Sequence, residues 1–336
     1  MSSRSRHFPW YNPAMQNLLN RLKTQNPDLK EAEIEGLLYI IRSRAALSSA
    51  LLMELTGLSK EVLRAFKSSI SYLLMDKPEL ELNKKGTLLL QESSLRPYAW
   101  SLLSYINTAA VESFLEIRKK YALVPKRAYD QFFATPQTSI NKAMLMMEKG
   151  VVKGRRIALL GDDDFVAIAL NLVGAGAKEI VVFDVDEAIL QTIASICIAL
   201  GYKNIKTVLC DLRKGLPRGY LHSFDGALTD PPYTASGVAL FLNRCIELLE
   251  PPRDFSGSYV FLACANSLRS PQKTLELQKI IADFNLVIED KIAKFNRYVG
   301  AETVGNASSM YVLKLTPKTK SIKLGDLTGI YTNASF

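Results

Sequence analysis

Apolar runs of four to seven residues recur along the second half of the chain, separated by longer stretches with helical spacing. An alternation of strand and helix is typical of a parallel sheet with helices on both faces, so we predict a Rossmann-like α/β fold for this part. A helix is expected over residues 165–174, in the first connection. The segments predicted as strands are residues 157–160, 179–183, 205–209, 224–229, 258–264, 286–292 and 310–315.

Apolar residues in the first third recur at three- and four-residue spacing, which predicts amphipathic helices. We expect a short helix over residues 48–55, and Ser59 is placed to cap a further helix over 60–73. Residues 79–90 alternate between polar and apolar positions and predict a hairpin. Helices followed by a hairpin are typical of a winged-helix domain, which we predict for residues 1–96.

Basic side chains lie on the exposed side of the helix predicted over 60–73 and on the expected hairpin: Lys60, Arg64, Lys67, Lys84 and Lys85. Such a surface suits a DNA backbone. Glu61 interrupts it, however, and no Asn or Gln on this helix offers a base contact. We therefore favour a dimerisation or lid module over binding of nucleic acid, and we expect a homodimer.

Residues 97–136 are predicted to connect this domain to a second one, which we place at residues 137–336. A helix over 97–121 leads into an extended segment that carries Asp130 and Gln131. A carboxylate, an amide and aromatic rings on an irregular segment are what a lid over a ligand needs. A packed linker is the alternative interpretation.

Acidic residues end successive strands of the predicted sheet. Ligands of such sheets bind at the carboxyl ends of the strands. Asp184 and Asp186 follow the second strand, at about the separation from the first at which a nucleotide-binding fold places its ribose-binding acid. We predict that Asp184 binds ribose hydroxyls, with Asp186 beside it, and that Asp211 binds an adenine amino group.

One glycine and three acids, Gly161, Asp162, Asp163 and Asp164, follow the first strand. Dinucleotide sites carry G-x-G-x-x-G here, and three negative charges repel a pyrophosphate or the carboxylate of S-adenosylmethionine. They favour decarboxylated S-adenosylmethionine, which keeps the sulfonium and a terminal ammonium. We therefore predict an S-adenosylmethionine-type domain, in which Gly161, Asp162 and Asp164 contact this co-substrate and Asp163 contacts the second substrate. Helix capping would explain one of the three acids.

The fourth strand ends in Asp230, Pro231, Pro232 and Tyr233. Each proline lacks an N–H and fixes its own φ, so nearby carbonyl groups stay free to accept from an amine held against Pro231 and Pro232. An aliphatic amine must lose a proton before it attacks. We predict that Asp130 and Asp230 serve as base and orienter, in an undetermined order, with Tyr233 lining the site and Gln131 contacting the substrate. A turn after a buried strand is the alternative.

The amino-acid composition limits the cofactors and locations to be expected. Four widely spaced cysteines and two histidines form no disulfide framework and no metal-ligand pattern, so we expect no metal and no permanently bound cofactor. No apolar run is long enough for a membrane span, and the start lacks the apolar core of a signal peptide, which together predict a cytoplasmic protein. The net charge of +9 is spread along the chain and indicates little about partners.

These motifs together resemble those of the branched-chain polyamine synthases, the N(4)-bis(aminopropyl)spermidine synthases, over nearly the whole chain. The resemblance implies transfer of an aminopropyl group from decarboxylated S-adenosylmethionine to a secondary amine of spermidine, with release of methylthioadenosine. The acceptor amine and the number of transfers stay open. The motifs that carry the resemblance are Tyr129 to Phe132 with Thr135 and Pro136, Gly161 to Asp164, Phe183 to Asp186, Asp211 to Arg213 and Asp230 to Pro232.

Two other functions fit part of the sequence. A methyltransferase acting on an exocyclic amine of a nucleic-acid base uses a similar Asp-Pro-Pro-Tyr element, but the acidic loop is a poor host for the carboxylate of its co-substrate. A DNA-binding regulator that only senses a ligand would use the predicted winged helix. The interrupted basic surface argues against that second alternative.

Overall fold

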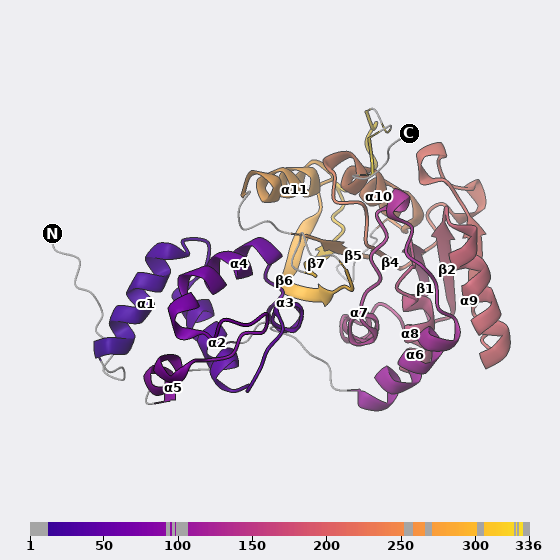
Figure 1. Cartoon of the computed structure of the whole chain (residues 1–336). Coiled ribbons are helices and arrows are strands. Elements are labelled where there is room, and N and C mark those ends of the chain that lie inside the picture. The colour runs from indigo at the N-terminus through magenta and orange to yellow at the C-terminus, as the bar shows by residue number, and fades with distance from the viewer. Residues whose placement is uncertain are drawn as a thin grey trace. The chain divides into compact units, whose positions relative to one another are not determined.

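The computed structural model describes residues 13–91, 95, 98, 107–251, 258–265, 271–300, 306–325, 327 and 329–331. The chain divides into two compact units (Figure 1), residues 1–100 with 302–306 and residues 101–301 with 307–336. The first is called the N-terminal unit and the second the sheet unit. The finer division predicted at residues 96 and 136 stays a prediction.

Amphipathic helices build the N-terminal unit. Ser59 caps α4 as predicted, its hydroxyl accepting from the Val62 amide at 3.4 Å. The same helix buries Val62, Leu63 and Phe66 in the apolar core of the unit. The helices predicted from apolar spacing are thereby confirmed. The elements are α1 (Pro13–Gln25), α2 (Glu31–Arg42), α3 (Ser49–Thr56), α4 (Lys60–Ser69), the 3₁₀ turn η1 (Ser71–Leu73) and α5 (Lys84–Gln91).

The hairpin predicted over residues 79–90 is wrong. Helix α5 occupies the place of its second strand, and Leu80 and Leu82 form only isolated bridges. Asn83 starts this helix, because its side-chain oxygen accepts from the Gly86 amide at 2.9 Å. Gly86 also packs so close to the Leu73 carbonyl that an added Cβ would lie 2.3 Å from its oxygen. The Lys-Lys-Gly sequence therefore opens a helix rather than a turn, and the winged-helix assignment is not confirmed.

A seven-stranded sheet forms the centre of the sheet unit, in the order β3-β2-β1-β4-β5-β7-β6. The five strands from β3 to β5 are parallel, whereas β7 runs antiparallel to both of its neighbours. The sheet is thus mixed and not wholly parallel as predicted, because the connection of residues 298–306 is too short for a parallel crossover. The strands are β1 (Arg156–Leu160), β2 (Glu179–Asp184), β3 (Ile205–Leu209), β4 (Gly226–Thr229), β5 (Tyr259–Cys264), β6 (Val287–Arg297) and β7 (Ala307–Lys314).

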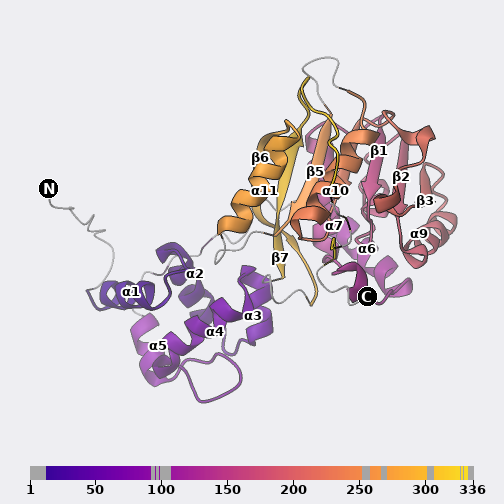
Figure 2. The same cartoon turned by 90° about the horizontal axis from the view of Figure 1, so that it is seen from above.

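Helices cover both faces of the sheet, and each face has its own apolar cluster. Helices α6 to α9 pack on one face and α10 and α11 on the other, where Figure 2 shows these two side by side. The helix predicted over 97–121 begins outside the described residues, and α6 forms its second half. No helix in the described part of the chain is long and apolar enough to cross a membrane. The helices are α6 (Thr108–Lys120), α7 (Pro136–Glu148), α8 (Val166–Leu172), α9 (Glu187–Leu200), α10 (Ala235–Leu248) and α11 (Pro271–Asp283), with 3₁₀ turns η2 (Arg127–Tyr129), η3 (Leu212–Lys214) and η4 (Arg218–Tyr220).

The carboxyl ends of the four strands β3, β2, β1 and β4 are level with one another. Leu160 pairs with both Phe183 and Thr229, and Asp184 pairs with Leu209. Parallel strands in register place the loops that follow them on one edge of the sheet. The acidic residues predicted at the strand ends therefore share that edge.

Gly237, in the first turn of α10, has no room for a side chain. An added Cβ would lie 2.7 Å from the Pro232 carbonyl oxygen, 2.9 Å from Thr234 Oγ1 and 3.0 Å from the Ile330 carbonyl oxygen. We expect Gly237→Ala to lower the free energy of unfolding by about 1–3 kcal/mol in urea denaturation, because backbone must shift. Gly219→Ala is the matched control, since nothing lies within 4 Å of its Cβ position. Equal losses in both variants would contradict this constraint.

Candidate active site

A pocket opens at the edge of the sheet where the parallel strands end. It lies between the loops after these strands, the segment of residues 121–135 before α7, called the connector, and the C-terminal segment, which contains Ile330 and Tyr331. Of the predicted site residues, those that line it are Asp130, Gln131, Gly161, Asp163, Asp184, Asp211, Asp230 and Pro232. The other predicted residues are not among its lining in the described part of the chain: Asp162, Asp164, Asp186, Pro231 and Tyr233. The ligand roles assigned to all of them stay predictions. The remaining lining residues are Tyr129, Phe183, Val185, Cys210, Leu212, Arg213, Phe241, Ile330 and Tyr331.

Asp162, the first acid of the loop, is buried and caps a helix. Its two carboxylate oxygens accept from the amides of Val166 at 2.6 Å and Ala167 at 3.0 Å, in the first turn of α8. Burial raises the pKa of Asp162 to about 8, against the lowering effect of these two hydrogen bonds. The first acid is therefore committed to starting α8.

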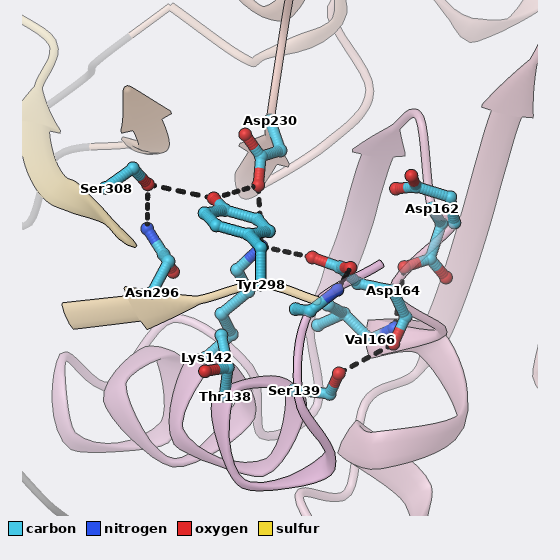
Figure 3. A network of polar contacts seen from close by, with 12 residues as sticks. Thr138, Ser139, Lys142, Asp162, Asp164, Val166, Asp230, Asn296, Tyr298 and Ser308 are labelled. Carbon is cyan, nitrogen blue, oxygen red and sulfur yellow. Dashed lines mark hydrogen bonds and ion pairs between the residues drawn. The ribbon is translucent and has the colours of Figure 1, made fainter. Parts of the chain in front are cut away.

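Asp164, the third acid, also faces inward. One of its carboxylate oxygens accepts from the Ala134 amide at 2.6 Å, and the other lies 2.5 Å from Nζ of Lys142. Its main-chain carbonyl accepts from the Ser139 hydroxyl at 2.7 Å. Figure 3 shows Ser139 and Lys142 reaching Asp164 from α7. The third acid thus attaches the loop to α7 and the connector.

Asp163, between Asp162 and Asp164, faces the pocket. Its carboxylate has no hydrogen bond or ion pair to another residue of the described chain, while its main-chain carbonyl accepts from Arg118 at 2.9 Å. Burial raises the pKa of Asp163 well above its ordinary value, and the nearby carboxylates of Asp164 and Asp230 raise it further. A cation entering the pocket would relieve this repulsion.

The Asp230 carboxylate lies at the pocket wall and accepts from three side chains. Its Oδ1 accepts from the Tyr233 hydroxyl at 3.0 Å. Its Oδ2 accepts from the Tyr298 hydroxyl at 2.6 Å and from Lys142 Nζ at 3.1 Å (Figure 3). Burial raises the pKa of Asp230, while the ammonium of Lys142 acts in the opposite direction. Tyr233 thus positions Asp230 and does not itself line the pocket.

The two acids after β2 have different partners. Asp184 accepts from the amides of Asp186 at 2.8 Å and Asp162 at 3.2 Å, and burial raises its pKa to about 6. Asp186 instead caps α9 through Ala188 and accepts from Lys126 at 2.6 Å and Gln131 at 3.1 Å. Asp186 therefore holds the connector, and Asp184 is the acid of this pair that reaches the pocket.

Asp211, after β3, lines the pocket while it pairs with Arg213. Two hydrogen bonds of 2.9 Å join the guanidinium to both carboxylate oxygens. The Arg213 guanidinium holds the pKa of the Asp211 carboxyl below its ordinary value. An ionised carboxylate at this position can still accept from a ligand, since each oxygen has two lone pairs.

The connector segment is fixed to the sheet unit at several points and carries the pocket-lining Tyr129, Asp130 and Gln131. Ala134 forms an antiparallel bridge with Tyr298, and Asp130 adopts a left-handed conformation with φ of 55°. The rings of Tyr129 and Tyr331 lie 5.8 Å apart between centroids, so the connector meets the C-terminal segment at the pocket. The expected role of the connector as a lid stays a prediction.

Two residues of the network were missed in the sequence. Lys142 stands among apolar positions of α7, and a lone lysine at a buried position is a signal that could have identified it. Tyr298 follows β6, and its partners Ala134 and Asp230 are distant in sequence, so no local pattern identifies it. The pocket-lining Tyr331 lies after β7, where the described residues form no strand or helix, and it likewise gave no signal.

Comparison with known proteins supports one family. The N(4)-bis(aminopropyl)spermidine synthase of Methanocaldococcus jannaschii is 38% identical over 211 residues, 62% of this chain. The synthase of that name from Thermococcus kodakarensis is 29% identical over 301 residues, 85% of this chain and 83% of that protein. The matched region spans 55% of the length of an uncharacterized protein from Methanocaldococcus jannaschii and 59% of the length of the synthase from that organism. The chain therefore spans little more than half the length of these two relatives.

The same family is found among solved structures and family models. The branched-chain polyamine synthase from Thermus thermophilus, solved in complex with N4-aminopropylspermidine and 5′-methylthioadenosine, has a TM-score of 0.62 at 21% identity. The superposition covers 93% of this chain and 96% of that one, which shows a shared fold. The family model described as the branched-chain polyamine synthase A C-terminal domain matches residues 109–331, more than half of the chain. The chain therefore belongs to the branched-chain polyamine synthase family.

Proposed function

We propose that this protein transfers the aminopropyl group of decarboxylated S-adenosylmethionine to an amine of a polyamine such as spermidine, releasing methylthioadenosine. The observation that carries the proposal is the Asp163 carboxylate, which faces the pocket without a partner in the described chain. A phosphate or carboxylate would be repelled there, whereas an ammonium or a sulfonium is attracted. The names of the two synthases and the ligands of the Thermus thermophilus structure support the same reaction.

The acids divide into ligand contacts and structural contacts under this proposal. Asp184 binds the ribose hydroxyls and Asp211 the adenine amino group of the donor. Asp163 receives a cationic group of the donor or acceptor, in place of the contacts first expected from Asp162 and Asp164. Those two residues keep the loop in shape through α8 and α7. No permanently bound cofactor takes part.

The chemical step is an in-line displacement. The lone pair of the acceptor nitrogen forms a bond to the methylene carbon next to the sulfonium, and the carbon–sulfur bond breaks. Its electron pair goes to sulfur, which leaves as the neutral thioether of methylthioadenosine, and the amine proton passes to a carboxylate or to water. Holding both substrates at one edge supplies most of the acceleration through proximity.

Asp130 and Asp230 have different roles in orienting and deprotonating the acceptor amine. Asp230 already accepts three hydrogen bonds, which suits a fixed carboxylate that orients an amine. Asp130 lines the pocket from the connector and is assigned as the base. The homodimer, the cytoplasmic location and the Rossmann-like S-adenosylmethionine-type character of the sheet unit belong to the same proposal.

The donor is tested by calorimetry. We expect decarboxylated S-adenosylmethionine to bind at least tenfold more tightly than S-adenosylmethionine, about 1.4 kcal/mol, because the extra carboxylate is repelled by Asp163. Methylthioadenosine serves as the reference without either charge. Preference for the carboxylated form would overturn the proposal and favour a methyltransferase.

The base and the orienter are tested by Asp130→Asn and Asp230→Asn. Each change is expected to reduce kcat/KM for release of methylthioadenosine at least tenfold, about 1.4 kcal/mol of transition-state stabilisation. Thermal denaturation of each variant separates this loss from unfolding. Unchanged turnover in both folded variants would show that neither carboxylate takes part.

Donor affinity should depend on pH. Acids with raised pKa take up protons as the pH falls through that pKa, so Asp184, with its pKa raised to about 6 by burial, loses its charge toward pH 5. The pKa of Asp163 is also raised by burial, so Asp163 also loses its charge as the pH falls. We expect the affinity for decarboxylated S-adenosylmethionine to fall between pH 8 and pH 5 about tenfold more than the affinity for methylthioadenosine. Asp163→Asn is expected to remove most of that difference. Parallel pH curves for the two ligands in the wild type would contradict this assignment.

A further inference from the structure

Lys142 is a fully buried cation beneath the pocket. Its side chain is 0% exposed, and Nζ lies 2.5 Å from Asp164 and 3.1 Å from Asp230. Figure 3 shows the lysine rising from α7 toward the two carboxylates, one on the acidic loop and one at the end of β4. Lys142 therefore joins the two ligand-facing loops of the pocket through one charge.

Stability alone is a weak reason for such a residue. Burial acts to lower the pKa of Lys142, but Asp164 and Asp230 outweigh it and leave the pKa above its ordinary value. Replacing a buried ion pair by apolar groups is often neutral or stabilising, because desolvation costs about as much as the pairing returns. A charge kept at this position points to a task in the pocket.

The hydrogen bonds around Asp230 indicate that task. Oδ2 is saturated, since Lys142 and Tyr298 take both of its lone pairs. Oδ1 accepts from Tyr233 alone among the described residues, which leaves one lone pair for a ligand on a residue that lines the pocket. The lysine and the tyrosines thus fix the carboxylate in one rotamer with one acceptor position open.

Several other titratable groups act on Asp230. Asp164 from the acidic loop raises its pKa and the Tyr298 hydroxyl lowers it. Asp163 and Asp230 repel each other. Burial raises the pKa values of Tyr233, on the same loop as Asp230, and of Cys264, at the end of β5, and the Asp230 carboxylate raises both further. Lys142 is the cation in this group, so its removal favours protonation of Asp230.

We propose that Lys142 is a positioning residue that keeps Asp230 ionised and oriented for a hydrogen bond from the acceptor amine. The inference deepens the proposed aminopropyl transfer and rests on it. The lysine touches no reacting atom and acts through Asp230. Its loss should therefore act on the acceptor through Asp230. It should leave binding of methylthioadenosine in place, because the proposed contacts Asp184 and Asp211 are held by hydrogen bonds from other residues.

The test compares Lys142→Met with the wild type in release of methylthioadenosine from decarboxylated S-adenosylmethionine and spermidine. We expect the acid limb of the kcat/KM profile for spermidine to move to higher pH by at least one unit, with a tenfold or greater loss at pH 7. Binding of methylthioadenosine, measured by calorimetry, should stay within twofold. The shift has this sign because a carboxylate without its ammonium ionises only at higher pH.

Lys149→Met is the matched control. Lys149 caps the C-terminus of α7 and, like Lys142, pairs with two carboxylates, those of Glu289 and Asp290. Neither of these partners lines the pocket, whereas Asp230 does. Its replacement should leave the pH profile in place. Tyr298→Phe removes the second donor from the same Asp230 oxygen and should move the acid limb in the same direction by a smaller amount. This variant decides the question if Lys142→Met does not fold.

The outcomes are distinct. A uniform loss of activity in Lys142→Met, with the acid limb unmoved, would mean that Lys142 is only structural and would overturn the inference. An unmoved limb in Tyr298→Phe would overturn it likewise. A wild type that binds methylthioadenosine but releases none from its substrates would remove the proposed function itself, and the inference with it.

Discussion

The ion pair of Lys142 with Asp164 is the interaction on which the geometry of the pocket depends. It joins α7 to the acidic loop, and through Asp230 it reaches the end of β4. Both carboxylates lie at the edge where parallel strands end, so the charge of one lysine offsets repulsion between loops that the fold forces together. Without it, two buried acids would face one another at the floor of the pocket.

The acidic loop shows how the chain separates structural from ligand-binding charge. Asp162 and Asp164 are both drawn inward, one by the amides that open α8 and the other by Lys142 and Ala134. Asp163, between two anchored neighbours, is left facing the pocket. Repulsion from Asp164 and Asp230 makes Asp163 costly to ionise in the empty pocket, and that cost falls when a cation binds. Asp164 and Asp230, which are held by Lys142, thus help to make Asp163 favour a cationic ligand.

Much of the fold followed from local pattern. Apolar runs predicted the strands because buried parallel strands need them, and acids at strand ends predicted a ligand edge because the registers are level. The hairpin prediction failed at Lys84, where Asn83 starts a helix that alternation concealed. Which of three consecutive acids faces the pocket could not be predicted from local pattern, since it depends on Lys142, which lies on another element 22 residues before Asp164.

The pairing of acids with cations also bears on which substrates the pocket suits. Under the proposed aminopropyl transfer, an acceptor polyamine and a sulfonium donor both bring positive charge, so the pocket has to be acidic. Too many ionised acids, however, raise the pKa of the amine that has to lose a proton. Tying Asp164 and Asp230 to one ammonium and Asp211 to Arg213 limits the net negative charge the amine meets. Carboxylates paired in this way keep hydrogen-bond acceptors for orientation while weakening the field that holds the proton on nitrogen. An acid-lined site can thereby bind a protonated amine and still permit its attack.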